Sequence, residues 1–486
     1  MWISFIIAYL AGVYPQKYEI IGVLTRAIIH STIYRLRGNH YLRVQGKLSL
    51  PQILTLGFLT IILVGTILLS LPIASRDGTA TSTINSFFTA TSATCVTGMT
   101  VVNTALHWSL FGKIVILILV EIGGLGFMTF AVLMFVFMRR KVDLTTQLLT
   151  QQSLNLETFA NTRSVVFLVV RLSLAIQLLG ALLLLVDFYP RYGLKKGIGF
   201  SIFHSISAFC NAGFDLFDNS LVRFQNDPYF LFVLTILIIS GSLGFLVWKD
   251  ILLYHEDHYL SLHTKLALTT YLGLIVLSFG VYLLTEGNFS ENQHLDFFQR
   301  LMNTYFMSVT PRTAGFYTVA PTHISMGGMF FTMILMLIGG TPGSTAGGIK
   351  TTTVGILLIR VWATLRGKRD ATFMGRRFTN SNVSRSLTLV FLVAVVLSVA
   401  TLVLTLTEKI PQHSGIEYIM FDVVSAFGTT GYTLGLTPHL TVIGKLIFAV
   451  LMFMGRVGVF TVMYSLLNSK RPEDAFRYPK ENVMIG

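Results

Sequence analysis

Four short segments of this 486-residue chain resemble one another and recur at near-constant intervals. Each has a glycine near its end and an aromatic residue ten positions before that glycine. The four glycines, in the sequences CVTGM, CNAGF, RTAGF and GTTGY, are Gly98, Gly213, Gly315 and Gly431. They lie 115, 102 and 116 residues apart. Three segments also have a serine six positions before the glycine, and the third has Val309 there. A regular period predicts that the chain folds as several copies of one structural unit.

Each glycine segment lies between two long apolar runs. About twenty apolar residues, at roughly 1.5 Å per residue, are enough to cross a membrane. The runs before the glycines are 52–73, 164–187, 264–284 and 386–407, and those after them are 112–138, 229–250, 329–362 and 441–467. The chain is 53% hydrophobic and 12% charged, whereas a soluble domain has about 25% charged residues. The sequence therefore predicts an all-α integral membrane protein with eight spans.

A shorter apolar segment precedes each glycine. These segments are 84–95, 198–210, 297–309 and 415–427. They are too short to span, so each is predicted to enter the membrane and return as a re-entrant helix. The expected order of helix, re-entrant helix, helix recurs four times around one pore. The predicted units are 51–140, 163–254, 264–362 and 384–468, with a cytoplasmic or interfacial segment at 1–50 and a cytoplasmic tail at 469–486.

The glycine loops suit a desolvated monovalent cation. Irregular backbone is not tolerated against lipid, so each loop must be buried in protein or line water. Glycine accepts positive φ at little cost, which lets backbone carbonyls turn toward one axis and replace the hydration shell of an ion. The negative C-terminal ends of the short helices favour a cation at the same place. Four such loops around an axis predict a cation pore.

Membrane orientation explains the formal net charge of +14 better than a nucleic-acid partner does. Seven basic residues between Arg360 and Arg385 are accompanied by one acid, whereas 285–295 contains no lysine or arginine. Basic loops of this kind face the cytoplasm, which places both termini there as well. The segment 187–199 is predicted to be external although it carries Arg191 and two lysines.

The glycine loops, together with GGTPGSTAGGIKTT at 339–352, resemble the Trk/Ktr/HKT superfamily of cation transporters over residues 50–486. The short chain and its ending RYPKENVMIG are more similar to the bacterial Ktr membrane subunit, KtrB, than to TrkH. The resemblance implies potassium uptake across the plasma membrane through a selectivity filter. In that superfamily a glycine in the first loop, here Gly98, goes with potassium and a serine with sodium. The filter residues that it implies are Val96, Thr97, Gly98, Asn211, Ala212, Gly213, Thr313, Ala314, Gly315, Thr429, Thr430 and Gly431.

The resemblance also implies partners. It implies a homodimer with one pore in each subunit, a cytoplasmic nucleotide-binding ring subunit of the KtrA type, and sodium as an activator. The basic loops 139–163, 249–265 and 360–385 are the expected contact face for the ring. No organic cofactor is implied on this chain. Channel-like conduction and symport both stay open.

The run 329–362 contains a cluster of residues that disfavour a helix. They are Gly339, Gly340, Pro342, Gly343, Gly347 and Gly348, with Ser344 and Thr345 between them. A proline removes a backbone donor and glycines weaken a helix, so the run is predicted to break near the membrane midplane. A simple packing kink is the alternative. The resemblance implies that the segment is an intramembrane gate below the filter.

Among the charged residues in or beside the predicted spans, four suggest a specific role. Arg456 is in the middle of the last run, where an ionisable residue is costly and usually faces a cavity or a partner. The resemblance implies that it lies against the gate as a barrier to cations, and snorkelling to an interface is the alternative. Lys350 fits either the gate or a solvated helix end. Glu121 is either an ion or proton relay or a hydrogen-bonded packing acid, and Arg312 is expected to point away from the third loop and brace it.

Two other classes of protein fit the sequence less well. A secondary permease would show two inverted repeats and a polar pocket at the midplane. An enzyme would need clustered nucleophiles, bases or metal ligands within the spans, and the sequence contains no such cluster. It also lacks the phosphate-binding motif GxxxxGK[ST], so it is not expected to drive transport by its own ATP hydrolysis.

Overall fold

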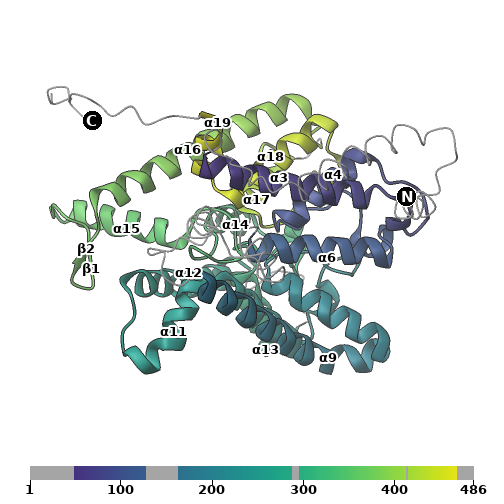
Figure 1. The fold of residues 1–486 in the computed structure, drawn as a ribbon, viewed down its shortest axis with the longest axis horizontal. Coiled ribbons are helices and arrows are strands. Elements are labelled where there is room, and N and C mark those ends of the chain that lie inside the picture. Colours follow the sequence, from purple (N-terminus) through teal and green to yellow (C-terminus); the bar gives the residue numbers. More distant parts are fainter. Residues whose placement is uncertain (1–48, 127–161, 287–294, 412–413, 468–486) are drawn as a thin grey trace, which may run out of the picture.

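The computed structural model describes residues 49–126, 162–286, 295–411 and 414–467, and these fold mainly into helices (Figure 1). Four helices are long and apolar enough to cross a membrane, and each stands at the start of a predicted unit. They are α3 (Leu50–Leu69), α9 (Thr162–Phe209), α12 (Leu262–Glu286) and α16 (Asn380–Thr407). Residues 1–48 of the predicted N-terminal segment, 139–161 of the basic loop 139–163, and the C-terminal tail, 469–486, lie outside the described residues.

A short helix precedes each of the four glycine loops. Three of them are α4 (Thr83–Thr94), α13 (Phe297–Val309) and α17 (Glu417–Gly428). The fourth is the last part of α9, because Gly193, with φ of 72°, breaks the helical backbone and separates the long first part from the short helix that ends at Phe209. Asp296 and Gln299 form a capping box that fixes the start of α13.

The helices after the glycine loops are broken more often than the sequence predicted. The chain is non-helical between α14 (Met326–Leu337) and α15 (Thr351–Leu365), where glycines and Pro342 predicted a break. The continuous helices predicted at 229–250 and 441–467 are wrong. α10 (Pro228–Ser242) and α11 (Phe245–Asp257) meet at 96°, and α18 (Val442–Val457) and α19 (Val459–Leu467) meet at 107°. Gly458 adopts φ of 97° at the second bend, a conformation that glycine accepts at little cost.

By length and composition alone, fewer than eight spans lie among the described residues. Counting each bent pair as one span gives up to six among the described residues. α6 (Leu110–Leu125) has sixteen residues and is followed by Gly126, whose φ is 86°, and α14 and α15 are each too short to cross. Smaller elements connect the helices: α5 (Thr104–His107), 3-10 turns at Pro72–Ala74, Val222–Phe224, Pro321–His323 and Thr437–His439, and an antiparallel hairpin of β1 (Thr372–Phe373) and β2 (Arg376–Arg377).

The helix contacts form a closed circuit. The helix after each glycine loop packs on the short helix that belongs to the next loop along the chain: α6 on α9, α10 on α13, and α14 on α17. The circuit closes because α18 packs on α4 and α19 packs on α3, which brings the two ends of the described chain together. In Figure 1 the purple and yellow ends of the colour scale accordingly lie side by side.

Glycines let three of the second helices approach the short helices closely. A Cβ at Gly123 would overlap the carbonyl of Thr94, at the end of α4. A Cβ at Gly241 would overlap the carbonyl of Phe209, and one at Gly455 would overlap that of Phe427. Close approach of this kind is a common use of small residues between membrane helices.

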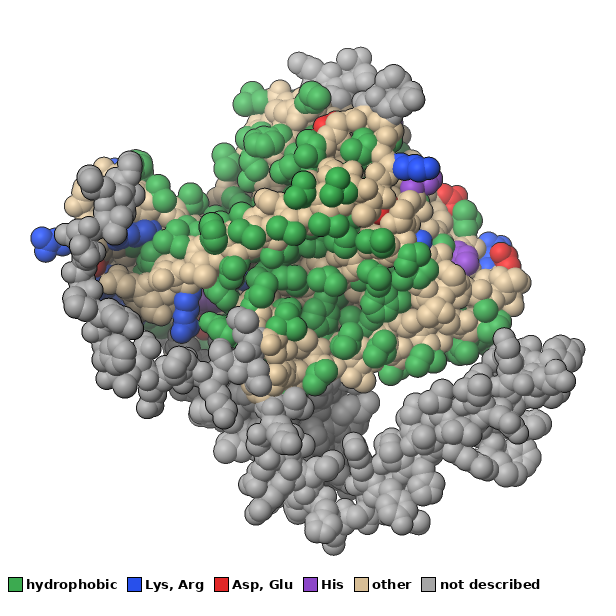
Figure 2. All heavy atoms as spheres, turned by 90° about the horizontal axis from the view of Figure 1, so that it is seen from above, with side chains coloured by type: hydrophobic (Ala, Val, Ile, Leu, Met, Phe, Trp, Pro, Cys, Tyr) green, Lys and Arg blue, Asp and Glu red, His purple; other side chains and the backbone are tan. Residues whose placement is uncertain are grey.

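The outside of the helical circuit is apolar. Only 22–33% of the most hydrophobic window of each long helix is buried within the protein. Figure 2 shows hydrophobic side chains spread across one face, while charged side chains gather toward its edges. Water would not favour so much exposed apolar surface, and a lipid environment does.

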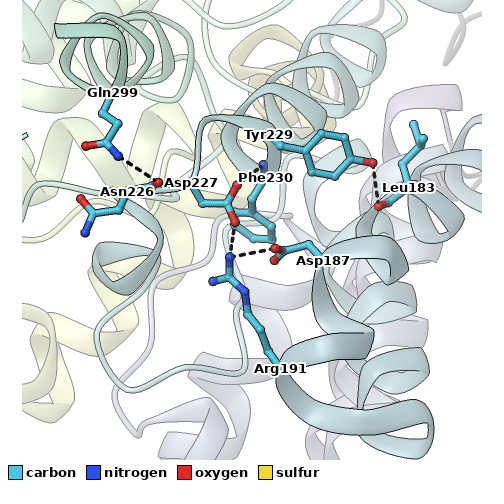
Figure 3. A network of polar contacts seen from close by, with 8 residues as sticks. All are labelled: Leu183, Asp187, Arg191, Asn226, Asp227, Tyr229, Phe230 and Gln299. Atoms are coloured by element: carbon cyan, nitrogen blue, oxygen red, sulfur yellow. Dashed lines mark hydrogen bonds and ion pairs between the residues drawn. The ribbon is translucent and has the colours of Figure 1, made fainter. Parts of the chain in front are cut away.

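A polar network joins the start of α10 to its neighbours (Figure 3). The guanidinium of Arg191 pairs with Asp187 at 2.8 Å and also with Asp227, which caps α10 by accepting a 3.0 Å hydrogen bond from the Phe230 amide. Gln299 of α13 donates to the carbonyl of Asn226 at 3.3 Å. The charge of Arg191, which seemed out of place in an external loop, is thus offset by two carboxylates.

Replacing Gly241 with alanine tests the close helix packing. The added methyl meets a backbone carbonyl that cannot rotate away, so Gly241→Ala should destabilise the fold by about 1–3 kcal/mol and lower the melting temperature of the detergent-purified protein. Gly273→Ala is the matched control, because Gly273 is exposed on α12 and a Cβ there meets nothing within 4 Å. Its melting temperature should stay equal or rise. Equal melting of both variants and the parent would contradict the packing.

Candidate functional site

The four glycine loops share one backbone conformation. Each glycine has positive φ, from 66° at Gly213 to 94° at Gly431. In each loop the residue two positions before the glycine also has positive φ, which is rare for a residue with a side chain. These residues are Val96 (58°), Asn211 (57°), Thr313 (76°) and Thr429 (53°). Such strained backbone persists only where the surrounding structure holds it, and it is concentrated at functional sites.

The four loops meet in a ring. A Cβ built on Gly98 would lie 2.5 Å from the Ala212 carbonyl oxygen and 2.9 Å from the Gly213 Cα. A Cβ on Gly213 would lie 3.0 Å from the Ala314 oxygen and 3.1 Å from the Gly315 Cα. One on Gly315 would overlap the Thr430 oxygen, and one on Gly431 would overlap the Thr97 oxygen. Each loop therefore touches the next in chain order, and the fourth touches the first.

Three of the loops are closed in the same way. The amide just before the glycine donates to the carbonyl five residues earlier: Thr97 to Ser92 at 2.8 Å, Ala212 to Ser207 at 2.8 Å, and Thr430 to Ser425 at 2.9 Å. These three carbonyls belong to the serines that recur in the sequence. The serine that recurs six residues before the ring glycine thus marks the same hydrogen-bonded turn in these three loops.

The third loop is closed differently. Its short helix ends at Val309, six residues before Gly315, whereas α4 ends four residues before Gly98. Pro311 explains the earlier end, because it has no amide with which to continue the helical hydrogen bonds, although Thr310 before it still has helical backbone. The Ala314 amide donates instead to Thr310 at 3.0 Å.

Side chains of the fourth loop hold the third loop in place. The hydroxyl groups of Thr310 and Tyr432 lie 2.6 Å apart, and the Tyr432 hydroxyl is also 3.0 Å from the Phe316 carbonyl, to which it donates. The Thr430 hydroxyl donates to the Pro311 carbonyl at 3.1 Å. These contacts replace the turn that the third loop lacks.

The non-helical segment at 338–350 folds back so that Ile338 and Ile349 pair in parallel, and this folded segment is called the hairpin below. The Gly339 amide donates to the Ile349 carbonyl at 2.9 Å, and the Ile349 amide donates to Leu337 at 3.0 Å. The Thr351 amide returns to the Gly340 carbonyl at 3.1 Å. The backbone groups released by the broken helix are thus paired, as membrane burial requires. The break is a folded structure, and the packing-kink interpretation is wrong.

Thr345, at the tip of this hairpin, joins it to the second loop. Its hydroxyl donates to the Phe209 carbonyl at 3.0 Å and accepts from the Asn211 side-chain amide at 3.0 Å. Its own amide donates to the Gly241 carbonyl at 3.2 Å. Gly347 lies against Thr429 of the fourth loop, where a Cβ would overlap the threonine side chain.

The bend between α10 and α11 also belongs to this contact. The Phe245 amide donates to the Gly343 carbonyl at 3.0 Å, and the Gly244 amide donates to the Thr341 hydroxyl. The Pro342 carbonyl lies so close to Gly244 that a Cβ there would overlap it. The hairpin thus occupies the space opened by the bend.

Arg456 connects three parts of the chain at this level. One guanidinium nitrogen donates to the Thr345 carbonyl, and the other donates to the carbonyls of Gly123 and, at 2.8 Å, Gly124. The prediction that this arginine lies in the middle of a continuous helix is wrong, because α18 ends at Val457. It lies at the bend, where its side chain reaches both the hairpin and the end of α6.

The side chain of Lys350 forms a hydrogen bond inside the hairpin. Its ammonium group donates to the Ala346 carbonyl at 2.6 Å, and the residue stands at the start of α15. The lysine therefore closes the base of the hairpin and is not a solvated helix end. Ser344, which the sequence grouped with the gate, has a buried hydroxyl with no hydrogen-bond partner among the described residues.

Two other charged residues take supporting positions. The Glu121 carboxylate accepts from the Gln177 side-chain amide at 3.0 and 3.2 Å and from the Cys210 thiol at 3.4 Å. These contacts favour the packing acid over the relay. Arg312 is fully buried, and its guanidinium lies 4.3 Å from the centre of the Tyr271 ring on α12. It braces the third loop against that helix.

Sequence reasoning missed the glycines that accommodate the short helices. Gly123, Gly241 and Gly455 follow their ring glycines by 24 to 28 residues, so a search of the second helices for glycine at that offset would have found them. It also missed the bend at Leu243 and Gly244. No group of three or more potential metal-ligating side chains occurs in the described part of the chain.

The chain matches the TrkH family, described as cation transport proteins, over residues 51–477. It belongs to that family. It is 48% identical to the potassium/sodium uptake protein NtpJ of Enterococcus hirae over 91% of this chain and 99% of that one. It is 39% identical to the Ktr system potassium uptake protein B of Bacillus subtilis over 90% and 96% of the two chains.

A solved structure shows the same fold. The potassium transporter TrkH from Vibrio parahaemolyticus matches with a TM-score of 0.68 over 96% of this chain and 95% of that one, at 18% identity. The resemblance inferred from the glycine loops is confirmed. This TrkH-family chain is a multi-pass membrane transporter and not an enzyme.

One titratable group lies beside the ring in the loop that follows the second glycine. The Asp215 carboxylate, two residues after Gly213, accepts a hydrogen bond from the Phe217 amide at 2.8 Å. Burial raises the pKa of Asp215 to about 7, and Arg223 and the Ser220 hydroxyl oppose this rise. The carboxylate is therefore charged above that pH and neutral below it.

This pKa predicts a pH effect on transport. A charged Asp215 attracts cations to the ring and a protonated one does not, so the apparent affinity for the transported cation should fall about threefold to tenfold between about pH 8 and about pH 6. Asp215→Asn should have the low affinity at both pH values. The measurement is cation flux into liposomes at varied external pH. A pH response of equal size in the variant would contradict the role of Asp215.

Proposed function

We propose that this TrkH-family chain is the pore-forming subunit of a Ktr-type potassium uptake system. The observation that carries the proposal is the closed ring of four glycine loops. In each loop φ is positive at the glycine and again two residues before it. We infer that this alternation turns successive carbonyls toward the axis of the ring. Rings of carbonyls from four loops would replace the hydration shell of the ion.

The proposed pore has four units around one pseudo-four-fold axis. The units are 51–140, 163–254, 264–362 and 384–468, each with a spanning helix, a re-entrant pore helix and a second helix. The circuit of helix contacts supports this, because each second helix packs on the pore helix of the next unit. All four pore helices end at the ring, and the negative ends of their dipoles favour a cation there.

Potassium is the proposed substrate. The named relatives are potassium or potassium/sodium uptake proteins, and the first loop of this chain has Gly98, the residue that goes with potassium in the superfamily. The proposed ion-binding carbonyls run from Val96 to Gly98, Asn211 to Gly213, Thr313 to Gly315 and Thr429 to Gly431. Channel-like conduction and symport would both use this ring.

The hairpin at 338–350 is the proposed gate. It contacts the second loop through Thr345 and the fourth through Gly347, so it lies across one side of the ring. Arg456 and Lys350 hold it in this position through carbonyl groups, and their positive charges oppose a cation. Release of the Arg456 contacts would let the hairpin move.

The proposed setting is a bacterial plasma membrane, with both termini in the cytoplasm. Two copies of the chain would form a homodimer, and a cytoplasmic nucleotide-binding ring subunit of the KtrA type would regulate them, with sodium as an activator. The name of the Bacillus subtilis relative as part of a Ktr system supports such a partner. Within the proposed contact face, 360–385 contains the exposed hairpin of β1 and β2 with its two arginines.

Serine substitutions in the ring test the filter. In Gly98→Ser and Gly315→Ser the side chain meets neighbouring backbone and the required φ is strained. Both variants should lower the ratio of potassium to sodium flux in liposomes by about tenfold or more. Gly78→Ser is the control, because Gly78 also has positive φ, at 68°, but a Cβ there meets nothing within 4 Å. Its flux ratio should match the parent, and unchanged ratios in both ring variants would sink the filter assignment.

Substitution of Arg456 tests the gate. Arg456→Ala removes the contacts with Thr345 and Gly124 and should raise the resting potassium leak of the purified subunit about tenfold, the effect of losing charge-assisted hydrogen bonds. Arg456→Lys keeps the charge but not the forked donors, so its leak should be intermediate. Arg366→Ala, at the exposed end of α15, is the control. A leak in Arg456→Ala no higher than in the parent would refute the barrier.

A further inference from the structure

The fourth loop is held from behind by a buried carboxylate. Asp422 lies in α17, nine residues before Gly431, and is fully buried. Its carboxylate accepts from the Thr433 hydroxyl at 2.6 Å, from the Leu434 amide at 2.8 Å and from the Thr437 hydroxyl at 3.0 Å. All three donors follow the glycine. Asp422 therefore fixes the outer limb of the loop, defined here as the six residues after the glycine, to its own pore helix.

The second loop is held by a histidine. His204, nine residues before Gly213, is also fully buried. Its Nδ1 lies 2.8 Å from the Phe200 carbonyl, which can only accept, so Nδ1 carries the hydrogen. Nε2 is then free to accept from the Leu216 amide, at 3.4 Å. The imidazole also stacks on Phe217, with ring centres 4.8 Å apart.

The two anchors are equivalent by position. Each is nine residues before the ring glycine, and each accepts from the amide three residues after it, Leu434 or Leu216. The same position is Thr89 in the first unit and Phe306 in the third. The hydroxyl of Thr89 has no hydrogen-bond partner among the described residues, and phenylalanine cannot accept.

The anchored loops are opposite each other in the ring. Gly213 lies between Gly98 and Gly315. The fourth loop closes the other side of the ring, because Gly431 contacts Gly98 and Thr430 lies against Gly315. Each unanchored loop thus touches two anchored ones. Strained backbone needs surrounding structure to hold it, and the two anchors supply that support across one diameter of the ring.

We propose that Asp422 and His204 are positioning residues that set the width of the ring and so its preference among monovalent cations. The inference rests on the proposed filter and deepens it. Neither side chain touches the ion. Each acts through the outer limb of its loop, by accepting hydrogen bonds that keep the carbonyls before the glycine in place.

The test compares removal of the acceptor with its conservative replacement. Asp422→Leu removes the three hydrogen bonds, and His204→Phe removes one while keeping a ring against Phe217. The ratio of potassium to sodium flux in liposomes should fall about tenfold in the first and about fivefold in the second, as expected for a charge-assisted and a neutral hydrogen bond. The maximal potassium flux should change less than the ratio.

Conservative variants that keep a hydrogen-bond acceptor distinguish a positioning role from an effect of charge or of general stability. Asp422→Asn keeps an oxygen for the Leu434 amide and turns the two hydroxyls into acceptors, so it should retain most of the selectivity. His204→Gln, with an oxygen near the place of Nε2, should do the same. Thr89→Val is the matched control at the equivalent position and should have the flux ratio of the parent.

Several results would overturn the proposal. One is a parental flux ratio in both Asp422→Leu and His204→Phe while Gly98→Ser alters it, which would leave the filter standing. Another is an Asn variant as unselective as Leu, which would assign the effect to charge. Unchanged ratios in the glycine variants as well would reject the filter itself. If Asp422→Leu does not fold, the flux ratios of His204→Phe, His204→Gln and Asp422→Asn test the positioning role by the same criteria.

Discussion

The structure depends on four stretches of backbone that approach one another more closely than side chains would allow. At each ring glycine the space for a Cβ is occupied by a carbonyl or a Cα of the neighbouring loop. Since every loop touches the next, moving one moves its neighbours, and the short helices must end at fixed points around the ring. The need for close backbone packing also applies to the helices around the ring. Gly123, Gly241 and Gly455 let the second helices reach the carbonyls at the ends of the short helices, so the tight packing extends one layer beyond the ring.

Burial in a membrane adds a second demand, because irregular backbone there must find partners within the protein. The hairpin at 338–350 meets it partly by pairing with itself and partly by using the bend between α10 and α11. Arg456 completes the arrangement. Its forked guanidinium gives donors to carbonyls of the hairpin and of α6 that the ends of broken or shortened helices leave without helical partners. A charge that is costly in a membrane is thus placed where several carbonyls need donors.

Much of this could be predicted from the sequence, for physical reasons that differ between parts. The ring glycines and the hairpin could be recognised in the sequence, because positive φ and broken helices require glycine and proline in dense or periodic patterns. The bends at Gly244 and Gly458 could not be predicted, because scattered glycines in an apolar run are compatible with a straight helix. The bend at Gly244 depends on contact with a distant residue, Thr341. For the same reason Arg456 was placed in mid-helix. Glu121 stayed open until its partner Gln177, on another helix, was known.

One residue, Asn211, connects the ring of glycine loops to the hairpin at 338–350. Asn211 belongs to the second loop, and its side chain donates to the Thr345 hydroxyl of the hairpin at 3.0 Å and to the Ser242 hydroxyl at 2.9 Å. The outer limb of the same loop is attached to His204. If the hairpin swings away, the Thr345 bond breaks, yet Ser242 on one side and His204 on the other still hold the loop. The proposed gate can then move without deforming the ring, as a pore requires in order to open and close while keeping its preference for one ion.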